Sequence, residues 1–279
     1  MTRFHAYSAM VVAAAVCLGL ATVQADASIM LRDANSIAQF DLASARGLHS
    51  WTVDGNEYMY QQWFWYRLGA NGPESSIDTL TLDGTPVLTD MNHDPDNYVD
   101  TLYARYVGEG FRVELWFILA GGAVGSGVSD LGEIIRITNT GSQNLDFHFF
   151  QYADFNLSDN NDTLEITGGN DTIAGNTAHQ TAPDVMVAET VVTPRPSRHQ
   201  VGLDGEILAL LDNAGPTVLD NDRGPVTGDA AWGFQWDRVI RPGGTVLISK
   251  DKNITPEPAT LALMGGGAIV ALVARRRRS

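Results

Sequence analysis

The stretch that decides the fold is Phe111-Arg112-Val113-Glu114-Leu115-Trp116-Phe117-Ile118-Leu119. Its large apolar side chains recur at every second position, which is the period of a β-strand and not that of a helix. Residues 145–149 and 232–236 show the same alternation. The chain is therefore expected to form strands that each bury one face.

Short clusters rich in Gly, Asn, Asp and Pro separate these strands. Examples are Asp54-Gly55-Asn56, Asn139-Thr140-Gly141-Ser142 and Pro242-Gly243-Gly244. Their spacing suits successive antiparallel hairpins. Between the two terminal segments no window keeps a period of 3.6 over three helical turns, so the crossover helices of a parallel α/β fold are not expected. We predict an all-β fold, an antiparallel β-sandwich.

The N-terminal residues 1–27 have the layout of a cleavable secretory signal peptide. A short basic region at Arg3 precedes an apolar run from Ala9 to Leu20, and small residues follow at Ala25 and Ala27. This order of basic, apolar and small residues is typical of a signal helix that is removed after export. We therefore expect the mature chain to begin close to residue 28.

The C-terminal residues 255–279 combine a stiff extended motif, an apolar run over 259–274 and a cluster of arginines. The residues of the motif and the cluster are Pro256, Glu257, Pro258, Arg275, Arg276, Arg277 and Arg278. A helix of about 16 residues is roughly 24 Å long, slightly less than a hydrocarbon core of about 30 Å. Fixed cations resist crossing that core. The segment is predicted to be a short transmembrane helix stopped by arginines.

This order of Pro-Glu-Pro, short apolar helix and arginine cluster resembles the PEP-CTERM sorting signal of Gram-negative bacteria. The resemblance implies that an exosortase, a membrane-embedded cysteine protease, cuts near Pro-Glu-Pro. It also implies export by the secretion translocon, an inner-membrane-anchored intermediate and final release to the cell surface or an exopolysaccharide matrix. An ordinary single-span tail anchor is the alternative. The expected divisions are a signal peptide (1–27), a β-sandwich domain (28–254) and a sorting signal (255–279).

Charge and cysteine usage exclude several classes of function. The chain carries 18 Lys and Arg against 33 Asp and Glu, a formal net charge of -15. Such a field repels nucleic acid, so nucleic-acid binding is not expected. The single cysteine, Cys17, lies in the predicted signal peptide. The mature domain is therefore expected to contain no disulfide, thiol nucleophile or cysteine-bound metal.

The densest aromatic block spans residues 58–66. On a strand, Trp63 and Trp65 share one face, whereas Phe64 and Tyr66 share the other. Aromatic rings fill most sandwich cores, and rings that stay exposed can stack on the faces of sugars. Core packing is the favoured interpretation, with Trp63 and Trp65 as candidate sugar-stacking residues in the alternative.

Hard oxygen ligands are concentrated in residues 154–176. The piece from Gly169 to Gly175 resembles part of a calcium-binding RTX repeat, but a β-roll needs stacked copies and only one is present. Asp, Asn and Gly also form ordinary turns, which is the favoured interpretation. An irregular Ca²⁺ site is the alternative, and its candidate ligands are Asp154, Asp159, Asp162 and Asp171.

The sequence contains no recognisable catalytic motif. The histidines lack metal-binding spacing, and neither a nucleophile elbow nor a phosphate loop is present. We therefore expect a non-enzymatic exported protein, structural or binding polysaccharide or Ca²⁺, with no catalytic residue and no other cofactor. The alternative is a secreted carbohydrate-active enzyme on a β-super-sandwich, with Glu133, Asp154 or Asp159 as acids. Residues 134–147 and 236–246 resemble strand-turn-strand segments of immunoglobulin-like modules and of mutarotase-like super-sandwiches.

Overall fold

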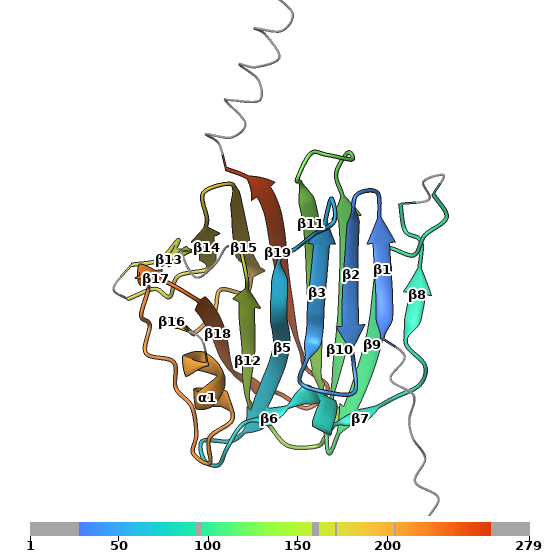
Figure 1. Cartoon of the computed structure of the whole chain (residues 1–279). Helices are drawn as coiled ribbons and strands as arrows, with labels where there is room; N and C mark the ends of the chain where they lie inside the picture. Colours follow the sequence, from blue (N-terminus) through green and yellow to red (C-terminus); the bar gives the residue numbers. More distant parts are fainter. Residues whose placement is uncertain (1–27, 93–95, 158–161, 171, 204, 258–279) are drawn as a thin grey trace, which may run out of the picture.

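Two large β-sheets pack face to face in the computed structural model, which describes residues 28–257 apart from 93–95, 158–161, 171 and 204 (Figure 1). The predicted all-β sandwich is confirmed. All strand pairs of the described residues are antiparallel except a short parallel contact between two strands of one sheet. The predicted signal peptide and the predicted apolar span 259–274 lie outside the described residues.

The sheet nearer the viewer in Figure 1, sheet A, has the strand order β1-β2-β3-β5-β12-β18-β16. The short strands β4 and β6 pair with β3 and β5. The bounds are β1 (Ile29–Asp33), β2 (Ser36–Asp41), β3 (Gly47–Val53), β4 (Asn56–Glu57), β5 (Met59–Leu68), β6 (Ser75–Ser76), β12 (Leu145–Phe155), β16 (Arg198–Leu203) and β18 (Ala230–Ile240).

The sheet behind it, sheet B, has the order β17-β13-β14-β15-β19-β11-β10-β9-β7, with β8 beside β9. Its bounds are β7 (Thr81–Leu82), β8 (Val87–Thr89), β9 (Thr101–Gly108), β10 (Phe111–Gly121), β11 (Ser129–Asn139), β13 (Thr163–Thr167), β14 (Thr177–Thr181), β15 (Val185–Thr193), β17 (Val226–Thr227) and β19 (Thr245–Pro256). The described residues also include a 3₁₀ turn, η1 (Ile77–Thr79), and one short helix, α1 (Glu206–Leu211).

Strand β10 buries the face that its alternation predicts. Its inward residues are 0 or 1% exposed: Phe111, Val113, Leu115, Phe117 and Leu119. Neighbouring strands β9 and β11 pair with it along most of its length. Burial of each such side chain contributes about 1.5–3 kcal/mol, so this strand supplies a large part of the core.

Aromatic rings from sheet A fill much of the space between the sheets. Phe155 stacks on Trp232 with 5.5 Å between ring centroids, and Phe64 stacks on Phe149 at 5.4 Å. Both faces of the aromatic block in β5 are buried, as Trp63, Phe64 and Trp65 are at most 1% exposed. The block is therefore enclosed on the inner and the outer side of sheet A.

An ionic cluster lies inside the sandwich. Lys250 and Lys252 on β19, Glu133 on β11 and Glu189 on β15 are each at most 2% exposed. The Lys250 ammonium lies 2.7 Å from Glu133 Oε2 and 3.1 Å from Glu189 Oε1, and Lys252 also pairs with Glu133. Two cations and two anions balance each other, which offsets the high cost of removing them from water.

Side chains of sheet A complete the hydrogen bonds of this cluster. Gln151 Nε2 donates to Glu189 Oε2 at 2.7 Å, and Lys250 Nζ donates to Gln151 Oε1 at 2.6 Å. The Trp232 indole donates to the same Glu189 oxygen at 2.9 Å. Because the charges come from sheet B and the amides and indole from sheet A, the cluster connects the two sheets in a single geometry.

Candidate functional site

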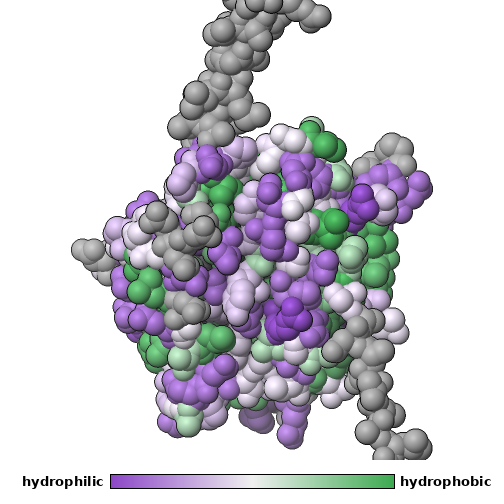
Figure 2. All heavy atoms as spheres, viewed as in Figure 1, coloured by the Kyte–Doolittle hydropathy of each residue, from purple (hydrophilic) through white to green (hydrophobic). Residues whose placement is uncertain are grey.

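The strand register assigns a defined set of side chains to the outer face of sheet A. Across the pair β5 and β12, Gln61 lies opposite Asp154 and Arg67 lies opposite His148. Asp237 on β18 is in turn opposite His148. These residues alternate with the core residues of the same strands, so they belong to the face turned toward the viewer in Figures 1 and 2.

A covering segment, residues 206–219, lies over the left part of this face (Figure 1). It consists of α1 and the residues that follow, and it buries Ile207, Leu211 and Leu219. The Trp65 indole donates to Asp212 of the covering segment at 3.2 Å. The covering segment therefore closes the outer side of β5 and β18 over their middle.

The two tryptophans of β5 are consequently not exposed. Trp63 is 0% and Trp65 1% exposed, and the Trp63 indole donates to Asp78 of η1 at 3.1 Å. Gly47, with φ +53°, lies directly against the Trp63 ring, where a side chain would not fit. Neither indole offers an open face to a sugar in this conformation. Their burial therefore does not support a role in sugar stacking, which stays a prediction.

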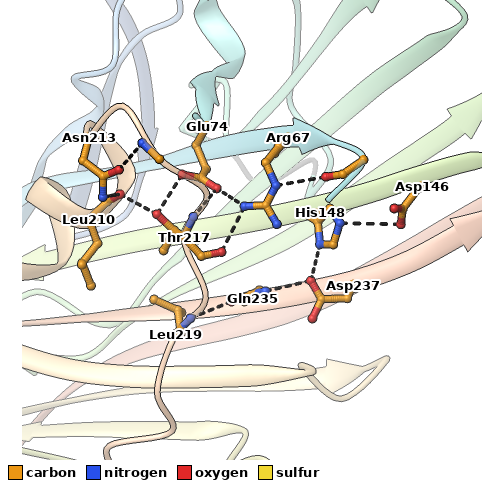
Figure 3. Close-up of polar contacts among 12 residues, drawn as sticks. Arg67, Glu74, Asp146, His148, Leu210, Asn213, Thr217, Leu219, Gln235 and Asp237 are labelled. Carbon is orange, nitrogen blue, oxygen red and sulfur yellow. Dashed lines mark hydrogen bonds and ion pairs between the residues drawn. The ribbon is translucent and has the colours of Figure 1, made fainter. Parts of the chain in front are cut away.

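Figure 3 shows how the covering segment is fastened to sheet A. Arg67 on β5 forms a buried ion pair with Glu74 and donates to the carbonyl oxygen of Thr217 at 3.0 Å. Glu74 in turn accepts hydrogen bonds from the amide and the hydroxyl of Thr217, at 2.9 and 2.8 Å. A charged pair of the sheet thus holds the end of the covering segment.

His148 extends the same network toward the next strand (Figure 3). Its Nδ1 lies 2.6 Å from Asp237, which also accepts a hydrogen bond from Gln235, whereas Nε2 is 3.6 Å from Asp146. A histidine oriented by a carboxylate is an arrangement used for proton transfer. Here Nε2 is shielded from solvent, and Gln235 accepts from the Leu219 amide of the covering segment. The network therefore serves to position this segment.

The outer face stays open beyond the covering segment, near the start of β5. Two cavities of about 160 and 250 Å³ lie there and share Tyr60. We call them together the sheet A groove. The first is lined by Tyr60, Asp154, Asn156 and Asp229, and the second by Arg46, His49, Met59, Tyr60 and Gln61.

His49 supplies an imidazole at one side of the sheet A groove. It stands on β3, with its Nδ1 3.4 Å from a guanidinium nitrogen of Arg46. Burial, together with the positive charge of Arg46, lowers the pKa of His49 below its ordinary value. The imidazole is therefore neutral near pH 7, and its protonated form is a stronger acid than an ordinary imidazolium.

Two carboxylates, Asp154 and Asp229, line the other side. Asp154 is 2% exposed, at an irregularity in β12, and accepts a hydrogen bond from the Tyr152 hydroxyl at 2.8 Å. Tyr60 is 62% exposed between the two sides. An open aromatic ring with carboxylates, amides and a neutral histidine is a suitable surface for a saccharide, whose rings stack and whose hydroxyls form hydrogen bonds.

Two of the four candidate calcium ligands, Asp154 and Asp162, lie in the described residues, and each accepts hydrogen bonds from the protein. Asp162 accepts hydrogen bonds from the Leu157 amide at 3.2 Å and from Gln180 at 2.9 Å, whereas Asp154 accepts from Tyr152. Within the described ranges no group of three or more His, Cys, Asp or Glu could hold a metal ion. The other two candidates, Asp159 and Asp171, lie outside the described residues, and their calcium role stays a prediction.

Arginines bind the carbonyl oxygens of the RTX-like loop, residues 168–176. Arg195 donates to the carbonyl of Ala174 at 2.9 Å, and Arg223 donates to those of Asn170 and Ile173 at 2.5 and 3.2 Å. Carbonyl oxygens are also what a calcium loop offers its ion. Two guanidinium groups thus occupy acceptors that Ca²⁺ would need.

Sequence reasoning assigned no role to His49, Tyr60, Gln61 or Asp229. These residues stand in no motif, and only the contact of β3 with β5 and the order β5-β12-β18 bring them to one face. Glu133, considered as an acid of an enzyme site, is instead 1% exposed in the ionic cluster. A substrate has no access to it there.

The sorting motif begins inside the sandwich. Strand β19 continues through Thr255 to Pro256, which pairs with Val185, and the Glu257 amide donates to Asp184 at 3.2 Å. The expected boundary after residue 254 therefore falls within a strand. Within the part of the chain that the structure describes, no helix is long and apolar enough to cross a membrane.

Comparison with known families identifies the tail. Residues 255–278 match the PEP-CTERM protein-sorting motif, which confirms the resemblance seen in the sequence. The motif implies export, a membrane-anchored sorting intermediate and an exosortase as the processing partner. Among curated proteins, no sequence matches the chain.

Several solved structures share the sandwich. A putative aldose 1-epimerase of Escherichia coli K12 is 10% identical, with a TM-score of 0.51 over 82% of this chain and 98% of its own. A protein of Synechocystis sp. PCC 6803 is 14% identical, with a TM-score of 0.53 over 82% and 96%. A bacterial glucoamylase complexed with acarbose is 8% identical, with a TM-score of 0.54 over 81% of this chain. The chain spans only 31% of that glucoamylase.

These structures correct the expectation of a protein that is not an enzyme. The glucoamylase and the putative epimerase are sugar-processing proteins, so the absence of a catalytic motif in the sequence does not exclude an enzyme on this fold. At such low identity the similarity shows the fold alone. The chain is thus an exported β-sandwich protein with a PEP-CTERM sorting signal at residues 255–278 and a fold shared with sugar-processing enzymes.

Proposed function

We propose that the mature domain is a saccharide-processing enzyme and that the sheet A groove is its active site. The observation that carries this proposal is that His49 and Asp154, which are distant in the sequence, line adjoining cavities that share Tyr60. The fold supports it, since the match to the putative aldose 1-epimerase covers 82% of this chain and 98% of that protein.

The proposed reaction is the epimerisation of an aldose at its anomeric carbon. One group removes the proton of the anomeric hydroxyl while the bond from that carbon to the ring oxygen breaks, and a second group gives a proton to the ring oxygen. Closure on the opposite face of the carbonyl reverses both transfers, so protons and electrons balance without a cofactor. We assign the first role to the carboxylate of Asp154 and the second to the protonated form of His49, which its lowered pKa makes a stronger acid than an ordinary imidazolium.

Other groups of the sheet A groove would bind and orient the sugar. The exposed ring of Tyr60 offers a face on which a pyranose can stack. Gln61 Nε2 donates to the Ala45 carbonyl at 2.6 Å, which fixes the amide and directs its oxygen to other donors. The Asn156 amide lines the cavity of Asp154 and can bind a second hydroxyl.

The test is magnetisation-exchange NMR on a panel of free aldoses, which measures the interconversion of the two anomers. Asp154→Asn and His49→Gln should each lower kcat about 100-fold or more, because proton transfer by a positioned group contributes that much. Glu109→Gln, at an exposed residue remote from the groove in sequence, is the matched control and should leave the rate unchanged. Wild-type protein that accelerates no aldose of the panel would refute the reaction.

A second reaction, glycoside hydrolysis, is favoured by one specific observation. Asp154 and Asp229 line the same small cavity, and glycosidases use a pair of carboxyl groups about 5–10 Å apart. Release of reducing ends from a glycan panel, lost in both Asp154→Asn and Asp229→Asn, would favour hydrolysis over epimerisation. Loss in Asp154→Asn alone would favour the epimerase.

We further propose that the substrate is a sugar with a free reducing end that derives from an exopolysaccharide at the cell surface or in the extracellular matrix. Support comes from the sorting motif, since it implies an exported protein handled by an exosortase. Replacement of Pro256, Glu257 and Pro258 by alanine should retain the protein in the membrane fraction. Unchanged release from the cells would contradict exosortase processing.

A further inference from the structure

A separate cavity of about 340 Å³ lies beside β16 and shares no lining residue with the sheet A groove. Its size is within the range of about 300–1,000 Å³ typical of small-molecule sites. The residues that matter to the argument are Asn170, Ile173, Ser197, His199, Asn221 and Arg223. They come from the RTX-like loop, from β16 and from the connections beside it.

His199 contributes a hydrogen-bond donor to this cavity. The side chain is 0% exposed, and its Nδ1 accepts a hydrogen bond from the Gly175 amide at 3.1 Å. Burial, together with the charge of Arg223, lowers the pKa of His199 to about 4, so the ring is neutral near pH 7. The ring hydrogen is therefore on Nε2, which has no hydrogen-bond partner. A nitrogen that carries hydrogen donates and does not bind a metal ion.

Arg223 contributes a positive charge whose position is fixed. One guanidinium nitrogen, Nη2, donates to the carbonyls of Asn170 and Ile173, and no described residue accepts a hydrogen bond from Nε or Nη1. The amide oxygen of Asn221 accepts from the His199 backbone at 3.4 Å, so its amino group is the remaining donor. Donors from three side chains thus line one cavity.

The loop carbonyls near this cavity are already engaged. The loop carbonyls of Asn170, Ile173 and Ala174 accept hydrogen bonds from Arg223 and Arg195. Two carboxylates influence His199, but Asp220 accepts the Asp222 amide at 2.8 Å and Asp222 accepts the Gly224 amide at 2.9 Å. Neither carboxylate is part of the cavity lining. Among the described lining residues, the loop carbonyls are therefore engaged, whereas His199 Nε2 and two guanidinium nitrogens of Arg223 remain as donors.

We infer that this cavity binds a carboxylate, held by the guanidinium of Arg223 and by His199 Nε2, and that the carboxylate belongs to a uronate residue of a saccharide. Arginine forms two parallel hydrogen bonds with a carboxylate, which favours this group over a single hydroxyl. The choice of a sugar acid over a free small carboxylate rests on the proposed function. The carboxylate preference itself rests only on the cavity.

The test is isothermal titration calorimetry of the wild-type domain with D-galacturonate, D-galactose and acetate. Galacturonate should bind at least about tenfold more tightly than galactose, because a hydrogen bond to a charged group is worth that much. Arg223→Gln should weaken galacturonate binding about tenfold or more, and Arg223→Lys should weaken it less. Arg241→Gln removes the same charge at an exposed turn and should change nothing.

Equal affinity for galactose and galacturonate, or an Arg223→Gln variant that binds as the wild type does, would overturn the carboxylate site. Acetate that binds as tightly as galacturonate would overturn the uronate assignment. Because Arg223 also holds the RTX-like loop, a second readout uses the unmodified protein. The ¹⁵N resonance of His199 Nε2 should move on addition of galacturonate, and a resonance that does not move contradicts the site.

Galacturonate binding at the cavity beside β16 is independent of the reaction proposed for the sheet A groove. Asp154→Asn should still bind galacturonate with wild-type affinity, even where it has lost turnover of aldoses. A failure of the proposed reaction would leave galacturonate binding intact, whereas a failure of the carboxylate site would leave turnover in the groove intact.

Discussion

The Lys250 ammonium lies 2.7 Å from the Glu133 carboxylate in the closed space between the two sheets. Burial alone would raise the pKa of Glu189, but Lys250, Lys252 and Gln151 hold it below its ordinary value. Burial lowers the pKa of Lys250 more than the two glutamates raise it. The cluster is therefore stable only as a whole, because the loss of one charge leaves another buried without its partner.

Glu133→Gln removes one of the two negative charges of this cluster. We expect the free energy of unfolding to fall by about 3–5 kcal/mol, since a buried charge then lacks compensation. Glu133→Gln combined with Lys252→Met restores neutrality and should recover part of the loss. Urea unfolding of the three proteins at pH 7 measures this. A loss below about 1 kcal/mol for the single variant would show that the cluster contributes little.

From Asp130 we predict a pH dependence of the unfolding free energy that is opposite in sign to the one an ordinary carboxylate gives. Burial, together with the charge of Asp251, raises its pKa to about 7, although Asn253 donates to it at 2.6 Å. The folded state therefore binds more protons than the unfolded chain between about pH 4 and 7, and this group makes stability decrease as the pH rises through that window. Asp130→Asn should raise stability at pH 8 by about 1 kcal/mol or more.

The measurement is the difference in unfolding free energy between the Asp130→Asn variant and the wild type from pH 4 to 8. Taking the difference removes contributions of other titrating groups such as His199 and Glu189. We expect it to increase with pH up to about 7 and then to level off. A difference that is constant over this range would contradict the raised pKa of Asp130.

Arg195 predicts that the RTX-like loop is stable without calcium. Its guanidinium bonds to the Ala174 carbonyl and to the Asn176 side chain, and it also contacts the Gly168 carbonyl. Arg195→Ala should lower stability by about 1 kcal/mol, or the melting temperature by about 2–4 °C. Millimolar Ca²⁺ or chelator should leave the wild-type melting temperature unchanged. A rise with Ca²⁺ would point to an ion that this loop or Asp159 binds.

The pairing of Pro256 with Val185 predicts where the mature chain ends. A cut before Thr255 would remove two paired residues from β19, which lies between β15 and β11 in sheet B. We therefore expect the released protein to retain Glu257, and intact-mass spectrometry of the secreted form measures this. A released, folded protein that ends at residue 254 or earlier would contradict the expectation.

The period of two in β10 was sufficient to predict a strand and its buried face, because one face of that strand packs on a continuous apolar core. The same rule misjudges β19. Lys250 and Lys252 stand between Ile248 and Ile254 on the inner face, and only the partners on β11 and β15 explain their burial. Local periodicity carries no information about partners that come from other strands.

Local periodicity could not predict the candidate site either, because the residues of the site come from different strands. His49 and Asp154 line adjoining cavities because β3 contacts β5 in parallel and β5 pairs with β12, which no local pattern encodes. Core packing was the favoured interpretation of Trp63 and Trp65, but the residues far along the chain that cover Trp65 could not be predicted. Only the tail could be recognised directly, because its function depends on order and composition within a short segment.

The sheet A groove is tested most directly by ¹H–¹⁵N correlation spectra of the wild-type domain during titration with D-galactose and D-glucose. We expect saturable shifts of the amide resonances of His49, Gln61 and Asn156, with Glu109 unaffected and the shifts weakened in Asp154→Asn. Spectra that do not change, or changes confined to residues outside the groove, would contradict a saccharide site on this face of the sandwich.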